Sequence, residues 1–211
     1  MTSTFGRFVL TLAAGLMLAG AAAAAAPKPF LGEEVDLGNP KAPVTVVEYL
    51  SASCPHCARF NNNVFPKLKA QYIDNGKVHY ILRELLTQPQ AFAAAGFLTA
   101  RCKGKEHYVA ALDTLYHQFD SIKKSSDMLA AIQKSGKAIG LNPKQVDACI
   151  TSKPALAALQ KRVEAAEKAG VDGTPTFFVN GTKLETGGEP SLGDLMLALE
   201  PALAKAAASE H

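Results

Sequence analysis

The stretch Ser53-Cys54-Pro55-His56-Cys57 decides the fold, because it joins a Cys-x-x-Cys pair to the signals for the start of a helix. It closely follows the mostly apolar run Val44–Leu50, which predicts a buried strand. Ser53 is predicted to cap the helix and Pro55 to occupy its first turn, where proline gives up no helical hydrogen bond. Cys54 then lies at the helix N-terminus, where free N–H groups and the helix dipole favour a thiolate over a thiol.

His56 stands between the two sulfurs and adds a ring N–H donor and a titratable charge. Both features are expected to stabilise the thiolate of Cys54 further. A stabilised thiolate favours the reduced form, so a disulfide between Cys54 and Cys57 is predicted to be an oxidant.

Two other interpretations of the Cys-x-x-Cys pair are weaker. Half of a zinc site would need a second pair of ligands, but the remaining cysteines, Cys102 and Cys149, stand alone. A purely structural bridge over so small a loop would restrain the unfolded chain little. The sequence therefore favours redox chemistry and no bound metal.

The N-terminus predicts a secretory signal peptide. Arg7 supplies a positive charge, and an apolar stretch from Phe8 to Ala19 leads into a run of alanines. Cleavage is expected after Ala25, since a cut after Ala26 would put Pro27 directly behind the scissile bond. Residues 1–25 would then be the signal peptide, and residues 26–211 one mature domain of roughly 185 residues. The alternative is a retained membrane anchor, for which this stretch is only weakly hydrophobic.

The net charge of the 211-residue chain is +3, with no clustered basic stripe. This balance gives no argument for nucleic-acid binding. An exported chain is free to form disulfides, so the redox motif and the predicted compartment agree.

Patterns along the chain predict a mixed α/β order. A brief edge strand is expected at 33–36, a helix after the motif that is kinked at Pro66 and ends near Asn75-Gly76, and a strand at 77–83 parallel to the first. Helical segments follow at 91–102, 106–119, 127–140, 142–152 and 154–169. The chain closes with a strand at 176–179, a turn at Asn180-Gly181, a strand at 182–186 and a helix at 192–206.

Glu48 is the one acidic residue in the apolar run Val44–Leu50. Either it points to an edge or to solvent, as glutamate usually does, or it is a buried acid beneath the active site. In the second case desolvation raises its pKa, and the group can accept or relay the proton of Cys57.

These motifs together resemble the DsbA-type periplasmic thiol:disulfide oxidoreductases. The resemblance rests on the run ending in Glu48-Tyr49, on Cys54-Pro55-His56-Cys57, on the helical segments at about 88–169, and on 173–181 with its Thr174-Pro175 pair. It covers essentially the whole mature chain. It implies an α/β thioredoxin fold with an inserted helical subdomain, located in the periplasm.

The resemblance also implies roles for single residues. Cys54 would be the exposed nucleophile, Cys57 the buried resolving cysteine, and Pro175 a cis-proline facing them, with a trans proline as the alternative. A cis bond leaves a free backbone edge at Thr174 to pair with an extended client. Oxidases of this family often pair the buried acid with a lysine on the next strand, where this chain has Tyr80 and Arg83.

The function implied is a dithiol oxidase that donates its Cys54–Cys57 disulfide to reduced, unfolded client proteins. It would act as a monomer, without a cofactor other than that disulfide, and a quinone-linked membrane oxidoreductase would reoxidise it. The first alternative is an isomerase or reductase kept reduced by a membrane donor, and its relatives also carry threonine at the Thr174 position. The second is a periplasmic metal-binding or chaperone protein.

Cys102 and Cys149 are predicted to form a second, structural disulfide. Both lie in the same helical block, neither has a Cys-x-x-Cys partner, and an oxidising compartment works against two unpaired thiols. The alternative is a pair of buried apolar cysteines too far apart to bridge.

Overall fold

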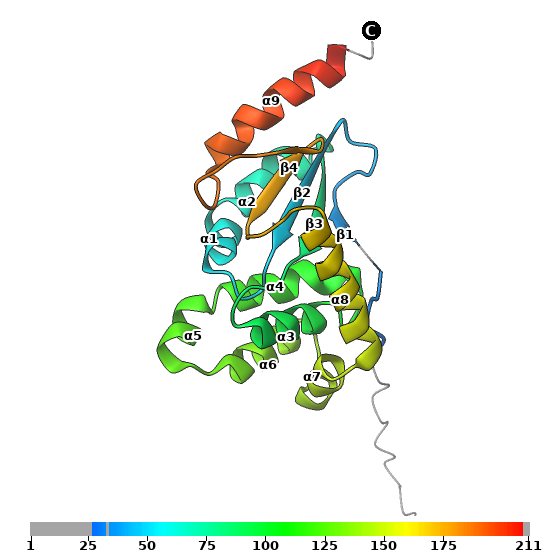
Figure 1. Cartoon of the computed structure of the whole chain (residues 1–211), viewed down its shortest axis with the longest axis vertical. Helices are drawn as coiled ribbons and strands as arrows, with labels where there is room; N and C mark the ends of the chain where they lie inside the picture. Colours follow the sequence, from blue (N-terminus) through cyan, green and yellow to red (C-terminus); the bar gives the residue numbers. More distant parts are fainter. Residues whose placement is uncertain (1–26, 33, 209–211) are drawn as a thin grey trace, which may run out of the picture.

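The computed structural model of the protein describes residues 27–32 and 34–208, and the predicted signal peptide at 1–25 lies outside them. In the described part, one sheet of five strands has the order β1-β3-β2-β4-β5 (Figure 1). The strands are β1 (Val35–Leu37), β2 (Val44–Leu50), β3 (Val78–Glu84), β4 (Thr176–Val179) and β5 (Thr182–Lys183). Strands β2 and β3 are parallel, as predicted, and the other neighbouring pairs are antiparallel.

The central strand β2 lies between β3 and β4 and is paired on both edges. Every residue of β2 is buried or partly buried, in agreement with its near-continuous apolar run. Val44 and Val46 are fully buried, and the strand ends four residues before Cys54. Strand β2 therefore delivers the cysteine pair to one end of the sheet.

The helices before the long insertion are α1 (Pro55–Asn63), α2 (Phe65–Leu68) and the short π-helix η1 (Lys69–Ile73). The expected kink at Pro66 is a division into two helices at Val64, two residues before the proline. Pro66 has no N–H to donate to the preceding turn, and its ring clashes with the carbonyl group four residues earlier. Val64 accordingly ends α1 and precedes the first residue of α2.

Six α-helices lie between β3 and β4: α3 (Gln90–Ala100), α4 (Tyr108–Tyr116), α5 (Phe119–Ser125), α6 (Met128–Ala138), α7 (Pro143–Ile150) and α8 (Lys153–Lys168). The helix expected at 106–119 is in fact the 3₁₀ turn η2 (Lys105–His107) followed by α4, and a separate helix begins at Phe119. Helices α3 to α7 gather at one end of the sheet, and α8 packs beside β3 (Figure 1).

The Asn180-Gly181 turn between β4 and β5 is confirmed. Both residues have positive φ, 47° and 81°, as a type I′ hairpin turn requires. Strand β5 is shorter than the predicted 182–186 and stops at Lys183. The chain then leads through a loop to the C-terminal helix α9 (Leu192–Ala208), which packs against β2.

The structure has a disulfide between Cys102 and Cys149, whose Cα atoms are 5.8 Å apart. It joins the turn after α3 to helix α7, both inside the helical block. Within 27–32 and 34–208, no helix has the length and hydropathy that crossing a bilayer requires.

Candidate active site

Cys54 is the N-cap residue of α1, and Pro55 occupies the first turn as predicted. The Cys57 backbone N–H donates to Cys54 Sγ at 3.4 Å, so the sulfur itself takes the capping position. The prediction that Ser53 caps the helix is therefore wrong. Ser53 Oγ instead donates to the carbonyl oxygen of Thr87 at 2.8 Å, which ties the active-site turn to the segment after β3.

The pKa of Cys54 is lowered to about 6. Hydrogen bonding with the Cys57 side chain is the largest cause, and it outweighs the opposing effect of burial. The backbone N–H groups of Cys57 and His56 lower the pKa further. Near neutral pH, Cys54 is therefore mostly a thiolate.

Cys57 behaves in the opposite way. It is 1% exposed, and burial raises the pKa of its thiol well above the usual value. Its hydrogen bond to Cys54 and the negative charges of Cys54 and Glu48 act in the same direction. The pair thus consists of one acidic sulfur and one that stays protonated. The expectation that Cys54 is exposed is wrong for this structure, because its side chain lies under the Thr174 backbone and only 5% of the residue is exposed.

Glu48 is buried on β2, with 5% of its surface exposed, so it does not point to solvent. Burial raises the pKa of Glu48 to about 7; the hydrogen bond from Tyr80 opposes that rise, and the charge of Cys54 adds to it. Tyr80 Oη donates to Glu48 Oε2 at 2.6 Å. Tyr80 thus contacts the buried acid from the neighbouring strand β3, a contact that the sequence did not predict.

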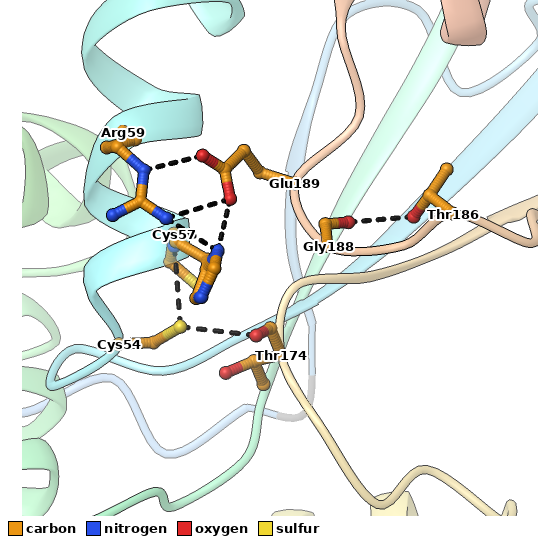
Figure 2. Close-up of polar contacts among 8 residues, drawn as sticks. Cys54, Cys57, Arg59, Thr174, Thr186, Gly188 and Glu189 are labelled. Atoms are coloured by element: carbon orange, nitrogen blue, oxygen red, sulfur yellow. Dashed lines mark hydrogen bonds and ion pairs between the residues drawn. The ribbon is translucent and has the colours of Figure 1, made fainter.

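Thr174 lies directly opposite Cys54, and the Thr174–Pro175 peptide bond is cis. Cys54 Sγ donates to the Thr174 carbonyl oxygen at 3.2 Å (Figure 2). Thr174 Oγ1 is buried and has no hydrogen-bond partner among the described residues. The structure therefore brings Thr174 and Pro175 to the cysteine pair, although they are 120 residues away in the chain.

The ring of His56 contacts two charged side chains, and its predicted effect on the Cys54 thiolate stays a prediction. Its Nδ1 contacts Glu189 Oε2 and lies 2.7 Å from Arg59 Nη2, while only its backbone N–H contributes to the lowered pKa of Cys54. Glu189 thus offers a carboxylate to both His56 and Arg59.

Glu189 and Arg59 are site residues that the sequence analysis missed. Arg59 Nε donates to Glu189 Oε1 at 2.5 Å and Arg59 Nη2 to Oε2 at 3.1 Å (Figure 2). Hydrogen bonds from Arg59, and then from His56, lower the pKa of Glu189 to about 2. Arg59 was recognisable as the helical neighbour of His56 at i+3, but no local signal points to a carboxylate 130 residues later.

The other histidines lie elsewhere. His79 Nε2 is 3.2 Å from Asp36 Oδ2, and His107 and His117 contact Glu106 and Asp113. The described ranges contain no group of three His, Cys, Asp or Glu side chains placed to hold a metal ion.

Comparison with known proteins agrees with this geometry. A family model described as thioredoxin matches residues 31–192. The chain belongs to the thioredoxin family. Its crystallised thioredoxin-family neighbours include alpha-DsbA1 of Wolbachia pipientis, with a TM-score of 0.74 and 27% identity over 84% of this chain and 94% of that one. The chain is thus a DsbA-type thioredoxin-family member with the helical insertion of that type.

A relative from Rickettsia prowazekii, named "Putative protein-disulfide oxidoreductase", is 35% identical over 169 residues. The match covers 79% of this chain and 60% of the relative, so this thioredoxin-family chain spans about three fifths of the length of that protein. Disulfide bond formation protein D of Bacillus subtilis is 26% identical over 68% of this chain and 66% of its own length.

Proposed function

We propose that this thioredoxin-family protein is a periplasmic dithiol oxidase that transfers its Cys54–Cys57 disulfide to reduced client proteins. The observation that carries the proposal is the difference between the two sulfurs, with the pKa of Cys54 at about 6 and that of Cys57 well above its usual value. A stable Cys54 thiolate favours the reduced protein, so the disulfide is readily given away.

The reaction begins when a client thiolate attacks Cys54 Sγ. A client–Cys54 bond forms, the Cys54–Cys57 bond breaks, and Cys57 leaves as a thiolate that takes up a proton. A second client thiolate then attacks the client sulfur of this mixed disulfide, and Cys54 leaves as a thiolate. The client is oxidised by two electrons and the Cys54–Cys57 pair is reduced by two.

Glu48 is proposed to supply and later accept the proton of Cys57. A buried carboxyl group with a pKa of about 7 populates both protonation states near neutral pH. The negative charge of Glu48 raises the pKa of Cys57, so the two groups lie close enough to influence each other. Tyr80, hydrogen-bonded to Glu48, holds the carboxyl group in place.

Thr174 and Pro175 are proposed to bind the client. The Thr174 carbonyl oxygen lies 3.2 Å from Cys54 Sγ, so a client segment that pairs with this backbone would bring its cysteine to the reactive sulfur. The names of the relatives, protein-disulfide oxidoreductase and disulfide bond formation protein, support client proteins of this kind. Reoxidation by a quinone-linked membrane oxidoreductase completes the proposed cycle, with no cofactor other than the disulfide.

The direction of the reaction is tested by equilibrating the protein with glutathione and by following the oxidation of a reduced, unfolded substrate. We expect rapid oxidation of the substrate. We also expect the equilibrium with glutathione to favour reduced protein and oxidised glutathione. Cys54→Ser is the inactive control. A protein that oxidises reduced substrates poorly and, in its reduced form, mainly reactivates scrambled ones would be an isomerase instead. Stoichiometric copper or zinc in protein purified without chelator would support the metal-binding alternative.

The periplasmic location is tested by fractionating cells that express the full chain. We expect a periplasmic protein whose N-terminus, measured by mass spectrometry, begins after Ala25. The Cys102–Cys149 disulfide supports this location, because such bonds persist in oxidising compartments. An intact N-terminus in the membrane fraction would instead indicate a retained anchor.

A further inference from the structure

Glu189 stands out because it joins two distant parts of the chain beside the reactive sulfur. It lies in the loop 184–191 between β5 and α9, and its carboxylate reaches the first turns of α1, the helix that begins behind Cys54 (Figure 2). Of the residues that the structure describes, Glu189 is the only carboxylate paired with His56 or Arg59.

The cluster of His56, Arg59 and Glu189 is organised by the carboxylate. Arg59 Nη2 and Glu189 Oε2 both contact the same ring atom, His56 Nδ1. A ring nitrogen carries either a proton or a free lone pair, so it donates to Glu189 or accepts from Arg59 but does not do both. The two oxygens of Glu189 hold Arg59 in either case.

Arg59 interacts electrostatically with the reactive sulfur as well as with the carboxylate of Glu189. Its pKa is raised first by the hydrogen bond to Glu189 and, to a smaller extent, by the negative charge of Cys54. The same positive charge is therefore shared between a permanent carboxylate and a thiolate that appears only in the reduced protein.

The loop is shaped to bring Glu189 to this position. Gly188 has φ of +153°, which glycine tolerates best, and its carbonyl oxygen accepts a hydrogen bond from Thr186 Oγ1 at 2.7 Å (Figure 2). A Cβ atom on Gly188 would lie only 3.7 Å from His56 Nδ1, so the loop backbone runs close to the ring.

We propose that Glu189 is a positioning residue that sets the redox balance of the active site. By holding Arg59 and the His56 ring, its carboxylate offsets the positive charge that would otherwise act on the Cys54 thiolate. Glu189 thereby makes the disulfide a milder oxidant than the same site would be without it. This inference rests on the proposed thiol–disulfide chemistry and names a residue that regulates it.

The other titratable groups around Cys54 come from three elements. They are His56, Cys57 and Arg59 on α1, Glu48 on β2 and Tyr116 on α4. Replacing Glu189 by glutamine leaves all of them in the chain and keeps the length of the side chain, so the change isolates the negative charge.

The test compares Glu189→Gln with Glu185→Gln, an exposed residue of the same loop with no ion pair among the described residues. Both variants lose one negative charge. We expect Glu189→Gln to lower the pKa of Cys54, measured by thiolate absorbance, and to shift the glutathione equilibrium about 1.5- to 5-fold toward reduced protein. Glu185→Gln should leave both quantities unchanged within error.

Arg59→Gln tests whether the effect runs through the cation. In that background the Glu189→Gln shift should fall to less than half, whereas a full shift would overturn the positioning role. A Cys54 pKa that stays the same or rises in Glu189→Gln overturns the proposal as a whole. The equilibrium is measurable even if substrate oxidation is absent, so failure of the oxidase function is recognised separately. Matched urea unfolding curves check that each variant is folded.

Discussion

At the scale of single residues, the acidity of Cys54 leads to a direct test. The thiolate absorbance of the reduced protein should titrate with a midpoint of about 6, whereas an ordinary cysteine titrates near about 8.5. Because the pKa is lowered in the folded state, ionisation of Cys54 stabilises the reduced fold fully above the unfolded pKa, and this contribution is lost as the pH falls through about 6. A midpoint near the ordinary value would contradict the mechanism.

Glu48 gives a prediction of the opposite sign. Its pKa is raised from 4.5 to about 7, so ionisation of the buried carboxyl group destabilises the fold. The penalty is absent below about pH 4.5, grows between there and about pH 7, and is complete above it. Glu48→Gln should therefore stabilise the reduced protein by up to about 3 kcal/mol more at about pH 8 than at about pH 4.

The measurement for Glu48 is the free energy of unfolding in urea at the two pH values. Glutamine retains an oxygen that accepts from Tyr80, which keeps the buried hydrogen bond. Glu185→Gln, on an exposed loop, is the control and should show no such pH dependence. Equal effects of Glu48→Gln at both pH values would mean that Glu48 ionises normally in the folded protein.

The sequence predicted the residues whose signals are local. It placed Cys54 and Pro55 at the start of α1 correctly, because the start of a helix depends on the types of a few neighbouring residues. It assigned the cap to Ser53 because serine is a strong capping residue, whereas in the structure Thr87 competes for that hydroxyl group. The partner of His56 was not predictable, since Glu189 comes to it only through the tertiary fold.

At the scale of elements, the disulfide between α7 and the turn after α3 is the main testable feature. It closes a loop with a sequence separation of 47, for which the chain-entropy model gives a stabilisation of up to about 4 kcal/mol. A Cys102→Ala/Cys149→Ala variant should unfold at a lower urea concentration. Its free energy of unfolding should be lower by an amount within that limit. Its Cys54 thiolate titration should stay unchanged, because the bond lies in the helical block.

Thiol counting provides the chemical check on the same element. Mild reduction should release two reactive sulfurs, Cys54 and Cys57, and two more should appear only after unfolding in strong reductant. Mass spectrometry of the oxidised protein should find a peptide that links Cys102 to Cys149. Free, alkylatable Cys102 and Cys149 in oxidised, denatured protein would refute the bond.

Strongly patterned elements were predictable and interrupted ones were less so. The predicted limits of β2 and the Asn180-Gly181 turn agree with the structure, because a long apolar run and a turn dipeptide each carry their own signal. The end of β5 was wrong by several residues. After Lys183 the chain bends into the loop 184–191, which the contact of Glu189 with α1 holds in place.

At the scale of the whole molecule, we predict a monomer that oxidises reduced substrates and repairs scrambled ones poorly. Size-exclusion chromatography with light scattering should give one chain per particle, alongside parallel assays of oxidation and of disulfide reshuffling. A stable dimer with efficient reshuffling would favour the isomerase alternative. The two results are independent, so each part of the prediction can fail separately.

The fold class followed from the order of the motifs along the chain. A strand, the Cys-x-x-Cys helix and a parallel strand, then helices and a late hairpin, permit few arrangements of one sheet. The packing of the helical block against the sheet could not be derived this way. Glu84, at the end of β3, pairs with Arg101, whose side chain is only 2% exposed, and with Arg162. The three residues are far apart in the chain, so no local spacing predicts these ion pairs.

The difference in pKa between the two active-site sulfurs also determines how the protein reacts with hydrogen peroxide. The Cys54 thiolate attacks one oxygen of hydrogen peroxide, the O–O bond breaks, and the products are a sulfenic acid and a hydroxide that takes up a proton to become water. Cys57, held beside it as a neutral thiol, then displaces the hydroxyl group, and the products are the Cys54–Cys57 disulfide and a second water. An oxidation that inactivates a lone acidic cysteine would here yield the Cys54–Cys57 disulfide, the form that the proposed oxidase donates to its clients.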